Sequence, residues 1–206
     1  MLRENRGYKL ITKRPALGDV LPDSLEDGYA GAVMFGGPMS ANDEDDFIKY
    51  EKEWIQVPLK ENKPFLGICL GAQLLSCSIG GTITTKNNVE IGYYPIKPTE
   101  YGKKLLNWPP FVHQWHREWM RPPKEAKILA VGLDEDPQAF QYGEKAFGIQ
   151  FHSELTLAMI NRWLVKAEHR LVMNGAQQRD KHFEGRLIYD KYVKTWLNDF
   201  FDLLLN

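Results

Sequence analysis

A cysteine with a glycine two residues away on each side is the feature of this sequence that points most directly to chemistry. Cys69 lies between Gly67 and Gly71 and follows an apolar run over residues 64–68. This spacing is typical of a nucleophile elbow, where a strand turns sharply into a helix and glycines avoid clashes at the turn. The N-terminal end of that helix would stabilise a thiolate at Cys69. The alternative interpretation is an inert cysteine buried in an apolar strand.

A nucleophilic thiolate needs a general base, and a histidine near the end of a second apolar run could supply it. His152 follows the run over residues 147–151 and is separated from Glu154 by one residue. An extended backbone points two such side chains to the same side. The carboxylate could orient the imidazole, and the imidazole could deprotonate Cys69. A solvent-exposed pair without catalytic function is the alternative.

The remaining histidines are placed differently along the chain. His113 and His116 lie close together in the middle of the sequence and are further candidates for a base. His169 and His182 fall in a tail that we expect to be helical, and we expect both to be exposed to solvent. The pair that ends the second apolar run is therefore the preferred partner of the thiol.

Composition excludes several classes of protein. The 206 residues are 43% apolar and 26% charged, with 26 basic and 27 acidic side chains. Without a basic excess, the chain lacks the charge that binds nucleic acids or anionic membranes. No apolar run approaches the ~18–20 residues that cross a bilayer, and the first seven residues lack the apolar core of a signal peptide. Two cysteines do not make a disulfide scaffold, so we expect a reducing, cytoplasmic setting.

The elements that must position these residues alternate between strand and helix in the first third of the chain. Buried strands that alternate with helices predict an α/β fold with a mostly parallel central sheet and flanking helices. Strands are expected over residues 8–12, 30–35 and 64–68, and helices over residues 47–59 and 70–79.

The middle and the end of the chain have a different pattern. Residues 82–151 contain several short β-like runs separated by Gly and Pro, which predicts a β-rich insertion. Helices are expected over residues 156–173, capped by Asn174 and Gly175, and over residues 188–205. The second of these helices carries an aromatic stripe that we expect to face the core. We therefore expect one domain over residues 1–206, with catalytic motifs within residues 31–154 and C-terminal helices within residues 156–206.

Three motifs in this order resemble the class I (triad) glutamine amidotransferases. The resemblance runs from about Asp27 to Glu154 and is closest to stand-alone relatives of the glutaminase domain of GMP synthase, which include the γ-glutamyl peptidases. It implies the flavodoxin-like fold of that family. The motifs are Gly36-Gly37-Pro38-Met39-Ser40, Gly67-Ile68-Cys69-Leu70-Gly71-Ala72-Gln73 and Gly148-Ile149-Gln150-Phe151-His152-Ser153-Glu154.

The resemblance also implies a role for each matching residue. Cys69 would be the nucleophile, His152 the general base and Glu154 its orienting carboxylate. No cofactor and no metal are implied. The remaining positions implied are the oxyanion-hole backbone N–H groups of Gly37 and Leu70, and the substrate-pocket residues Gln73 and His116.

The implied reaction is hydrolysis of the glutamine side-chain amide through a γ-glutamyl thioester, with release of ammonia. Because the sequence contains no phosphate-binding loop and no second domain to use ammonia, a separate synthase subunit could dock here. Alternatively, the protein could be a γ-glutamyl peptidase or hydrolase that acts on small-molecule γ-glutamyl conjugates. A non-catalytic binding protein on the same fold and a hydrolase of the wider cysteine-elbow superfamily are further alternatives. Whether the chain forms a homo-oligomer is left open.

The start of the chain raises a separate question. The resemblance implies a strand between those that match residues 8–12 and 30–35, and no residues precede Met1 to form it. The strand over residues 8–12 could pair directly with the strand over residues 30–35, another chain could supply the missing strand, or the gene product could be longer than this sequence. We predict the first arrangement, with a ladder between residues 10–13 and 33–36, since unpaired backbone groups would cost ~1–3 kcal/mol each.

Overall fold

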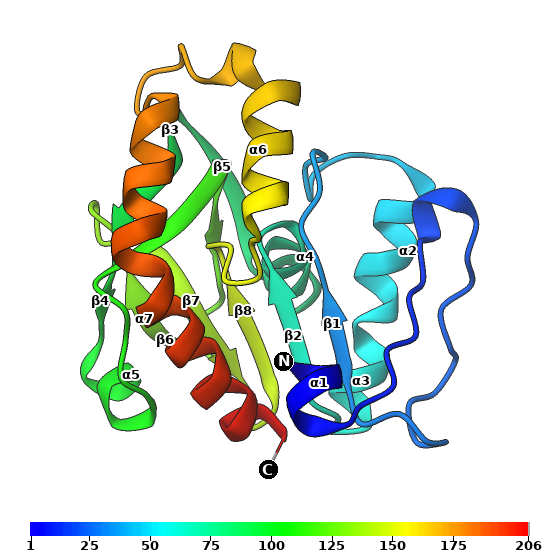
Figure 1. Cartoon of the computed structure of the whole chain (residues 1–206). Coiled ribbons are helices and arrows are strands. Elements are labelled where there is room, and N and C mark those ends of the chain that lie inside the picture. Colours follow the sequence, from blue (N-terminus) through cyan, green and yellow to red (C-terminus); the bar gives the residue numbers. More distant parts are fainter. Residues whose placement is uncertain (206) are drawn as a thin grey trace.

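The computed structural model describes residues 1–205 and shows a mixed sheet between two layers of helices (Figure 1). The strand order is β1 (Ala32–Met34), β2 (Phe65–Ile68), β8 (Ala146–Ile149), β7 (Pro137–Tyr142), β6 (Lys127–Val131) and β4 (Lys97–Pro98). Strands β1, β2 and β8 are parallel to one another and β6 runs in the same direction, whereas β7 and β4 run the opposite way. Because four of the six strands share one direction, the expected mostly parallel α/β sheet is confirmed.

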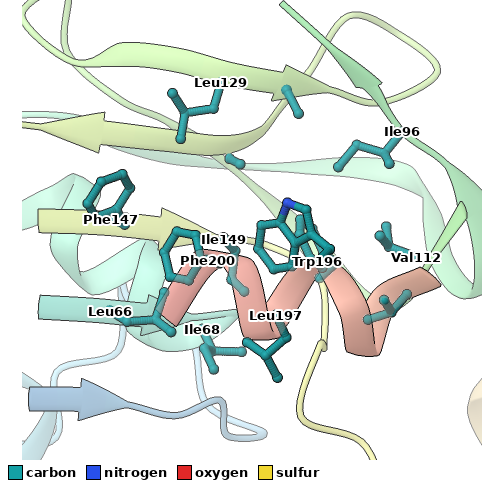
Figure 2. Packing of buried hydrophobic residues seen from close by; sticks show 14 of the residues in the cluster. Leu66, Ile68, Ile96, Val112, Leu129, Phe147, Ile149, Trp196, Leu197 and Phe200 are labelled. Atoms are coloured by element: carbon teal, nitrogen blue, oxygen red, sulfur yellow. The ribbon is translucent and has the colours of Figure 1, made fainter. Parts of the chain in front are cut away.

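One face of the sheet packs against the long C-terminal helix α7 (Arg179–Leu205), which crosses it in Figure 1. Figure 2 shows Phe200 of this helix beside Phe147 of β8 and Leu66 of β2, with Leu197 beside Ile68, and Trp196 belongs to the same buried cluster. The expected aromatic stripe therefore faces the core. The helix begins well before residue 188 and extends to Leu205, and residue 206 of the expected helical tail lies outside the described residues.

The opposite face of the sheet is covered by three helices: α2 (Asp46–Trp54), α3 (Gln56–Lys60) and α4 (Leu70–Ser78). Phe65 of β2 points to this side, because successive side chains of a strand alternate between faces. The single helix expected over residues 47–59 is divided in two. Pro58, which has no backbone N–H, lies in the first turn of α3, where the missing donor is tolerated.

Only part of the β-rich insertion expected over residues 82–151 stands apart from the central sheet, because β4, β6, β7 and β8 belong to that sheet and the two remaining strands form a separate ribbon. Strands β3 (Thr82–Pro95) and β5 (Phe111–Arg121) are antiparallel, and α5 (Glu100–Leu105) lies between them in the sequence. Helix α6 (Leu157–Lys166) packs its apolar side chains on this ribbon. It ends before residue 173 and is followed by η2 (Glu168–Arg170), so Asn174 and Gly175 do not cap it.

The strand predicted over residues 8–12 is wrong. The chain begins with α1 (Leu2–Arg6), continues without regular structure to η1 (Pro15–Leu17), and leaves Leu10 59% exposed. Within residues 1–205, β1 pairs with β2 alone, so the predicted close-up against residues 33–36 is also wrong. Leu10 and Ile11 are 59% and 54% exposed, so this segment does not gain the apolar burial that would hold it on the sheet.

Among the helices of residues 1–205, none combines the length and the hydropathy that a membrane-spanning helix requires.

Candidate active site

Cys69 occupies a strained turn between β2 and α4. It has φ +53° and ψ −108°, a region that side chains other than glycine rarely adopt. Its N–H donates to the carbonyl of Ile149 at 2.8 Å, which extends the parallel ladder to the turn. A Cβ atom at Gly67 would clash with the carbonyl of Gly71, and a Cβ atom at Gly71 would clash with the carbonyl of Met34. The elbow predicted from the glycine spacing is therefore present, and both glycines are needed for close packing.

Two backbone segments meet at the same cavity as Cys69. Leu70 begins α4, and the N–H groups of a first helical turn have no partner within the helix. Gly37, in the loop after β1, lies so close that a Cβ there would approach Leu70 Cδ2 to 3.3 Å. Both residues line the cavity together with Cys69. The two segments expected to supply oxyanion-hole donors are thus side by side next to the thiol.

His152 and Glu154 follow β8, and the His152 ring and the Cys69 side chain both lie against Gly36. Nδ1 of His152 lies 2.7 Å from Oε1 of Glu154. A Cβ at Gly36 would approach both His152 Cε1 and Cys69 Cβ to 3.1 Å, so the absence of a side chain there lets the imidazole and the thiol come together. The ring of Trp163 in α6 packs edge-on against the imidazole at 4.8 Å between centroids.

The electrostatic surroundings of His152 favour the imidazolium. Burial lowers the pKa of His152. The negative charges of Glu154 and Cys69, with their hydrogen bonds, have the larger effect and raise the pKa to about 10. The proton on Nδ1 is donated to Glu154. At neutral pH the ring therefore carries a proton that can be given to a leaving group.

The cavity that contains Cys69 has a volume of about 410 Å³. One wall is acidic: Glu118 Oε1 accepts a hydrogen bond from the Ser40 hydroxyl at 2.8 Å, and Asp43 accepts one from the Ser40 N–H at 2.8 Å. Positive charge comes from Arg170 of η2 and from Arg117 beside Glu118, and His169 of η2 also lines the cavity. His169 is exposed, as predicted. Because the cavity presents both signs of charge, it suits a zwitterionic ligand.

Gln73 and His116 lie in the cavity wall, where they were expected. Gln73 Nε2 lies 3.2 Å from the carbonyl oxygen of Glu118, and His116 Nδ1 lies 3.0 Å from the same oxygen. His116 Nε2 is 3.0 Å from Oε2 of the buried Glu90. These contacts hold the imidazole of His116 in the wall, which favours a structural role in the pocket over a second catalytic base.

Two features of the site were missed from the sequence. Gln150 is fully buried, and its Nε2 lies 3.8 Å from the sulfur of Cys69. His182 was expected to be exposed but is buried, with Nδ1 3.0 Å from His113 Nε2. The alternation of a strand could have revealed Gln150, because residues 150 and 152 point to the same side. The burial of His182 depends on how α7 packs on the ribbon, which no local pattern shows.

Residues 1–205 contain no group of three or more His, Cys, Asp or Glu side chains arranged to hold a metal ion.

Sequence comparisons give a consistent picture. A family model described as glutamine amidotransferase class-I matches residues 7–184. The chain is 29% identical over 178 residues to the glutamine amidotransferase-like protein YfeJ of Salmonella typhimurium, a match that covers 82% of this chain and 74% of that protein. It is 33% identical over 147 residues to the glutamine-hydrolysing GMP synthase of Aeropyrum pernix, covering 70% of this chain but only 27% of the synthase.

The fold is also similar to that of a solved glutamine amidotransferase. The crystal structure of a glutamine amidotransferase from Thermotoga maritima superimposes with a TM-score of 0.87 at 28% identity. The match covers 100% of this chain and 90% of that protein. The overall fold described above is therefore shared with that structure.

Proposed function

The chain belongs to the class-I glutamine amidotransferase family, and we propose that it hydrolyses the side-chain amide of glutamine with Cys69, His152 and Glu154 as its catalytic triad. Membership of the family supports hydrolysis of a glutamine amide in general. One observation supports the residue assignment above all: Cys69 stands at a strained elbow with its side chain and the His152 ring both against Gly36, while Glu154 holds the imidazole.

In the first half-reaction, the Cys69 thiolate attacks the side-chain carbonyl carbon, and the C=O electron pair moves to oxygen. The N–H groups of Gly37 and Leu70 donate to this oxyanion, and loss of one such donor typically costs ~3 kcal/mol of barrier. When the oxyanion collapses, the C–N bond breaks and the nitrogen takes the proton of the His152 imidazolium. Ammonia leaves, and a γ-glutamyl thioester remains on Cys69.

In the second half-reaction, neutral His152 takes a proton from water as the water oxygen attacks the thioester. The C–S bond then breaks, and the sulfur leaves as the thiolate that started the cycle. The product is glutamate, and His152 is again an imidazolium. Glu154 keeps the ring oriented through both steps without itself exchanging a proton.

The charges of the cavity support recognition of an α-amino acid. Asp43 and Glu118 on the acidic wall would attract the α-ammonium group, and Arg170 of η2 would attract the α-carboxylate. Both acidic side chains already accept hydrogen bonds from Ser40, which limits their freedom and favours a defined position for the ammonium group.

Hydrolysis of γ-glutamyl conjugates is a second candidate, favoured by the extent of the cavity. The space runs from the thiol to Met173 and the exposed His169, beyond the elbow itself. A substituent on the amide nitrogen could occupy this part of the cavity. The same triad and thioester would serve, with an amine in place of ammonia. A purely non-catalytic role is disfavoured, because nucleophile, base and orienting carboxylate are all retained.

A separate ammonia-consuming subunit is the partner that we propose if glutamine is the substrate. In the GMP synthase relative, the match covers 27% of the protein, so most of that protein lies outside it. Ammonia released from this chain could therefore be used by a synthase that docks on it. A reactive free thiol is also suited to a reducing compartment such as the cytoplasm.

The decisive assay compares substrates directly. Purified protein is incubated with glutamine and with several γ-glutamyl dipeptides, and released ammonia and released amino acids are quantified separately, with Cys69→Ser as the blank. Ammonia release from glutamine that the substitution abolishes supports the first proposal. Cleavage of the dipeptides alone supports the second candidate, and no turnover of either class contradicts both.

A further inference from the structure

Gln150 is a buried polar side chain in contact with the reacting atom, and the triad does not account for it. We propose that Gln150 is a further catalytic residue whose side-chain amide donates a hydrogen bond to the Cys69 thiolate. The inference rests on the proposed function, because it assumes that Cys69 is the nucleophile. Gln150 Nε2 lies 3.8 Å from the sulfur, within hydrogen-bonding distance for sulfur, and the side chain is fully buried.

The neighbours of Gln150 determine which end of its amide faces the sulfur. The carbonyl oxygen of Glu118 can only accept, so the group of Gln73 that lies 3.2 Å away must be its NH₂. The same NH₂ lies 3.3 Å from the Gln150 side chain, which must therefore present its oxygen there. The remaining end of Gln150 is its NH₂, and it faces Cys69.

The position of Gln150 is held by the sheet and is protected from water. Its backbone N–H donates to the carbonyl of Gln138 at 2.8 Å, directly after β8. Gln138 in turn is held by the buried carboxylate of Glu90, at 3.0 Å. A donor fixed in this way loses little entropy when it binds a thiolate, and a charge-assisted bond in a buried site is stronger than one in water.

Gln73 connects this donor to the substrate cavity. Because its NH₂ group donates to Glu118 and to Gln150, the side-chain oxygen is the part of Gln73 that remains to accept from a ligand. Gln73 lines the cavity. A substrate N–H that donates to this oxygen would polarise the side-chain amides of Gln73 and Gln150 in turn. The hydrogen bond from Gln150 to the Cys69 sulfur would then be stronger. Substrate binding and thiolate stabilisation are therefore coupled through Gln73 and Gln150.

The experiment measures the thiolate directly and needs no turnover. The rate of Cys69 alkylation by iodoacetamide is followed by mass spectrometry of the intact protein and its peptides, over a range of pH. Gln150→Met keeps the size of the side chain but removes the donor, and Gln150→Glu replaces the donor with a negative charge. The matched control is Gln141→Met, which removes another buried amide that donates to the carbonyl of Glu144 at 2.9 Å and does not line the cavity.

We expect the pH at which alkylation reaches half its maximum to rise by about one unit in Gln150→Met, in line with loss of one hydrogen bond to a charged group, and further in Gln150→Glu. At a pH below the wild-type midpoint, alkylation should be about tenfold slower in Gln150→Met than in the wild type. Gln141→Met should lower stability without changing the pH profile. A purely structural role for Gln150 predicts that Gln150→Met also loses stability but keeps the wild-type pH profile, and that result would overturn the inference.

A third variant covers the outcome in which the Gln150 variants do not fold. Gln73→Met leaves Gln150 in place but removes the partner that orients its amide, so the midpoint of alkylation should rise by a smaller amount, about half a pH unit. An unchanged midpoint in Gln73→Met would contradict the proposed coupling. Failure of the proposed function looks different: in that case wild-type Cys69 itself would react no faster than Cys77.

Discussion

The imidazole Nδ1 of His152 and the carboxylate Oε1 of Glu154 lie 2.7 Å apart, and the imidazole is almost fully buried. Burial lowers the pKa of His152, whereas the charge of Glu154 and that of Cys69 raise it to about 10. The carboxylate therefore has two effects, since it orients the ring and keeps its proton in place at neutral pH. Glu154 thus controls the pH range in which His152 can act as an acid.

Replacing Glu154 with Gln should move the upper pH limit of activity downward. Without the negative charge, the pKa of His152 falls from about 10 toward the value that burial favours, so the proton for the leaving group is lost at lower pH. We expect kcat to fall about 10- to 100-fold and the alkaline limb of the rate profile to move by at least about one pH unit. Steady-state rates between about pH 6 and 11 measure both.

The matched control for this change is Glu144→Gln, an exposed carboxylate that does not line the cavity. It should leave both the rate and the alkaline limb unchanged. An alkaline limb that stays in place in Glu154→Gln would mean that another group orients and charges His152.

Replacing Gly71 with Ala should abolish activity, because the added methyl group would clash with the carbonyl of Met34 in β1. The elbow would have to shift, and the thiol would move with it. We expect a destabilisation of about 2 kcal/mol or more, measured by urea denaturation. Gly80→Ala is the comparison: its φ of +94° is strained for alanine, but nothing lies within 4 Å, so about 1 kcal/mol is lost and activity is retained. Wild-type activity in Gly71→Ala would show that the elbow tolerates movement.

Helix α7 should contribute most of its stabilisation through the side that faces the sheet. Phe200 is fully buried against Phe147, with rings 5.2 Å apart, so Phe200→Ala should cost about 3–5 kcal/mol. Leu187, on the same helix, is 86% exposed, and Leu187→Ala should change the free energy of unfolding by less than about 0.5 kcal/mol. Equal losses in the two variants would contradict the packing seen in Figure 2.

The buried pair of His113 and His182 should make the protein sensitive to acid. Burial and the neighbouring histidine lower the pKa of His113 well below 6.5, and burial lowers the pKa of His182. The unfolded chain therefore binds more protons than the folded one below about pH 6.5, and the free energy of unfolding falls as the pH falls. Each histidine accounts for up to ~1.4 kcal/mol per pH unit.

His182→Gln tests this effect, because the amide oxygen can accept the hydrogen bond from His113 without titrating. The variant should lose less stability than the wild type between about pH 7.5 and 5, as measured by urea denaturation at each pH. The same loss in both proteins would show that other groups cause the acid sensitivity.

The parts of this site that sequence reasoning found are those set by local spacing. The glycines around Cys69 predict the elbow because the turn itself requires them. His152 and Glu154 are two residues apart, so a short extended segment is enough to bring them to one side. Neither inference needs knowledge of the rest of the fold.

The parts that sequence reasoning missed depend on distant elements. The contact between Gln150 and Cys69 needs β8 beside β2, and the wall formed by Gln73 and Glu118 needs the β3–β5 ribbon to fold over α4. His182 was assigned to the surface because it falls in the helical tail, but the ribbon covers it. The strand expected over residues 8–12 is wrong because its apolar residues Leu10 and Ile11 lie exposed to solvent, and the local pattern does not show whether a neighbouring strand is there to pair with them.

The central claim is that Cys69 is the nucleophile for a glutamine-like substrate, and the two cysteines of the chain test it within one sample. Cys69 is only 7% exposed, whereas Cys77 in α4 is partly accessible, and burial raises the pKa of the Cys77 thiol. The protein is treated with a chloroketone analogue of glutamine at neutral pH, and the modified peptide is identified by mass spectrometry. We predict a single adduct on Cys69, formed despite its lower accessibility and suppressed by added glutamine. An adduct mainly on Cys77, or none on Cys69, would contradict the account.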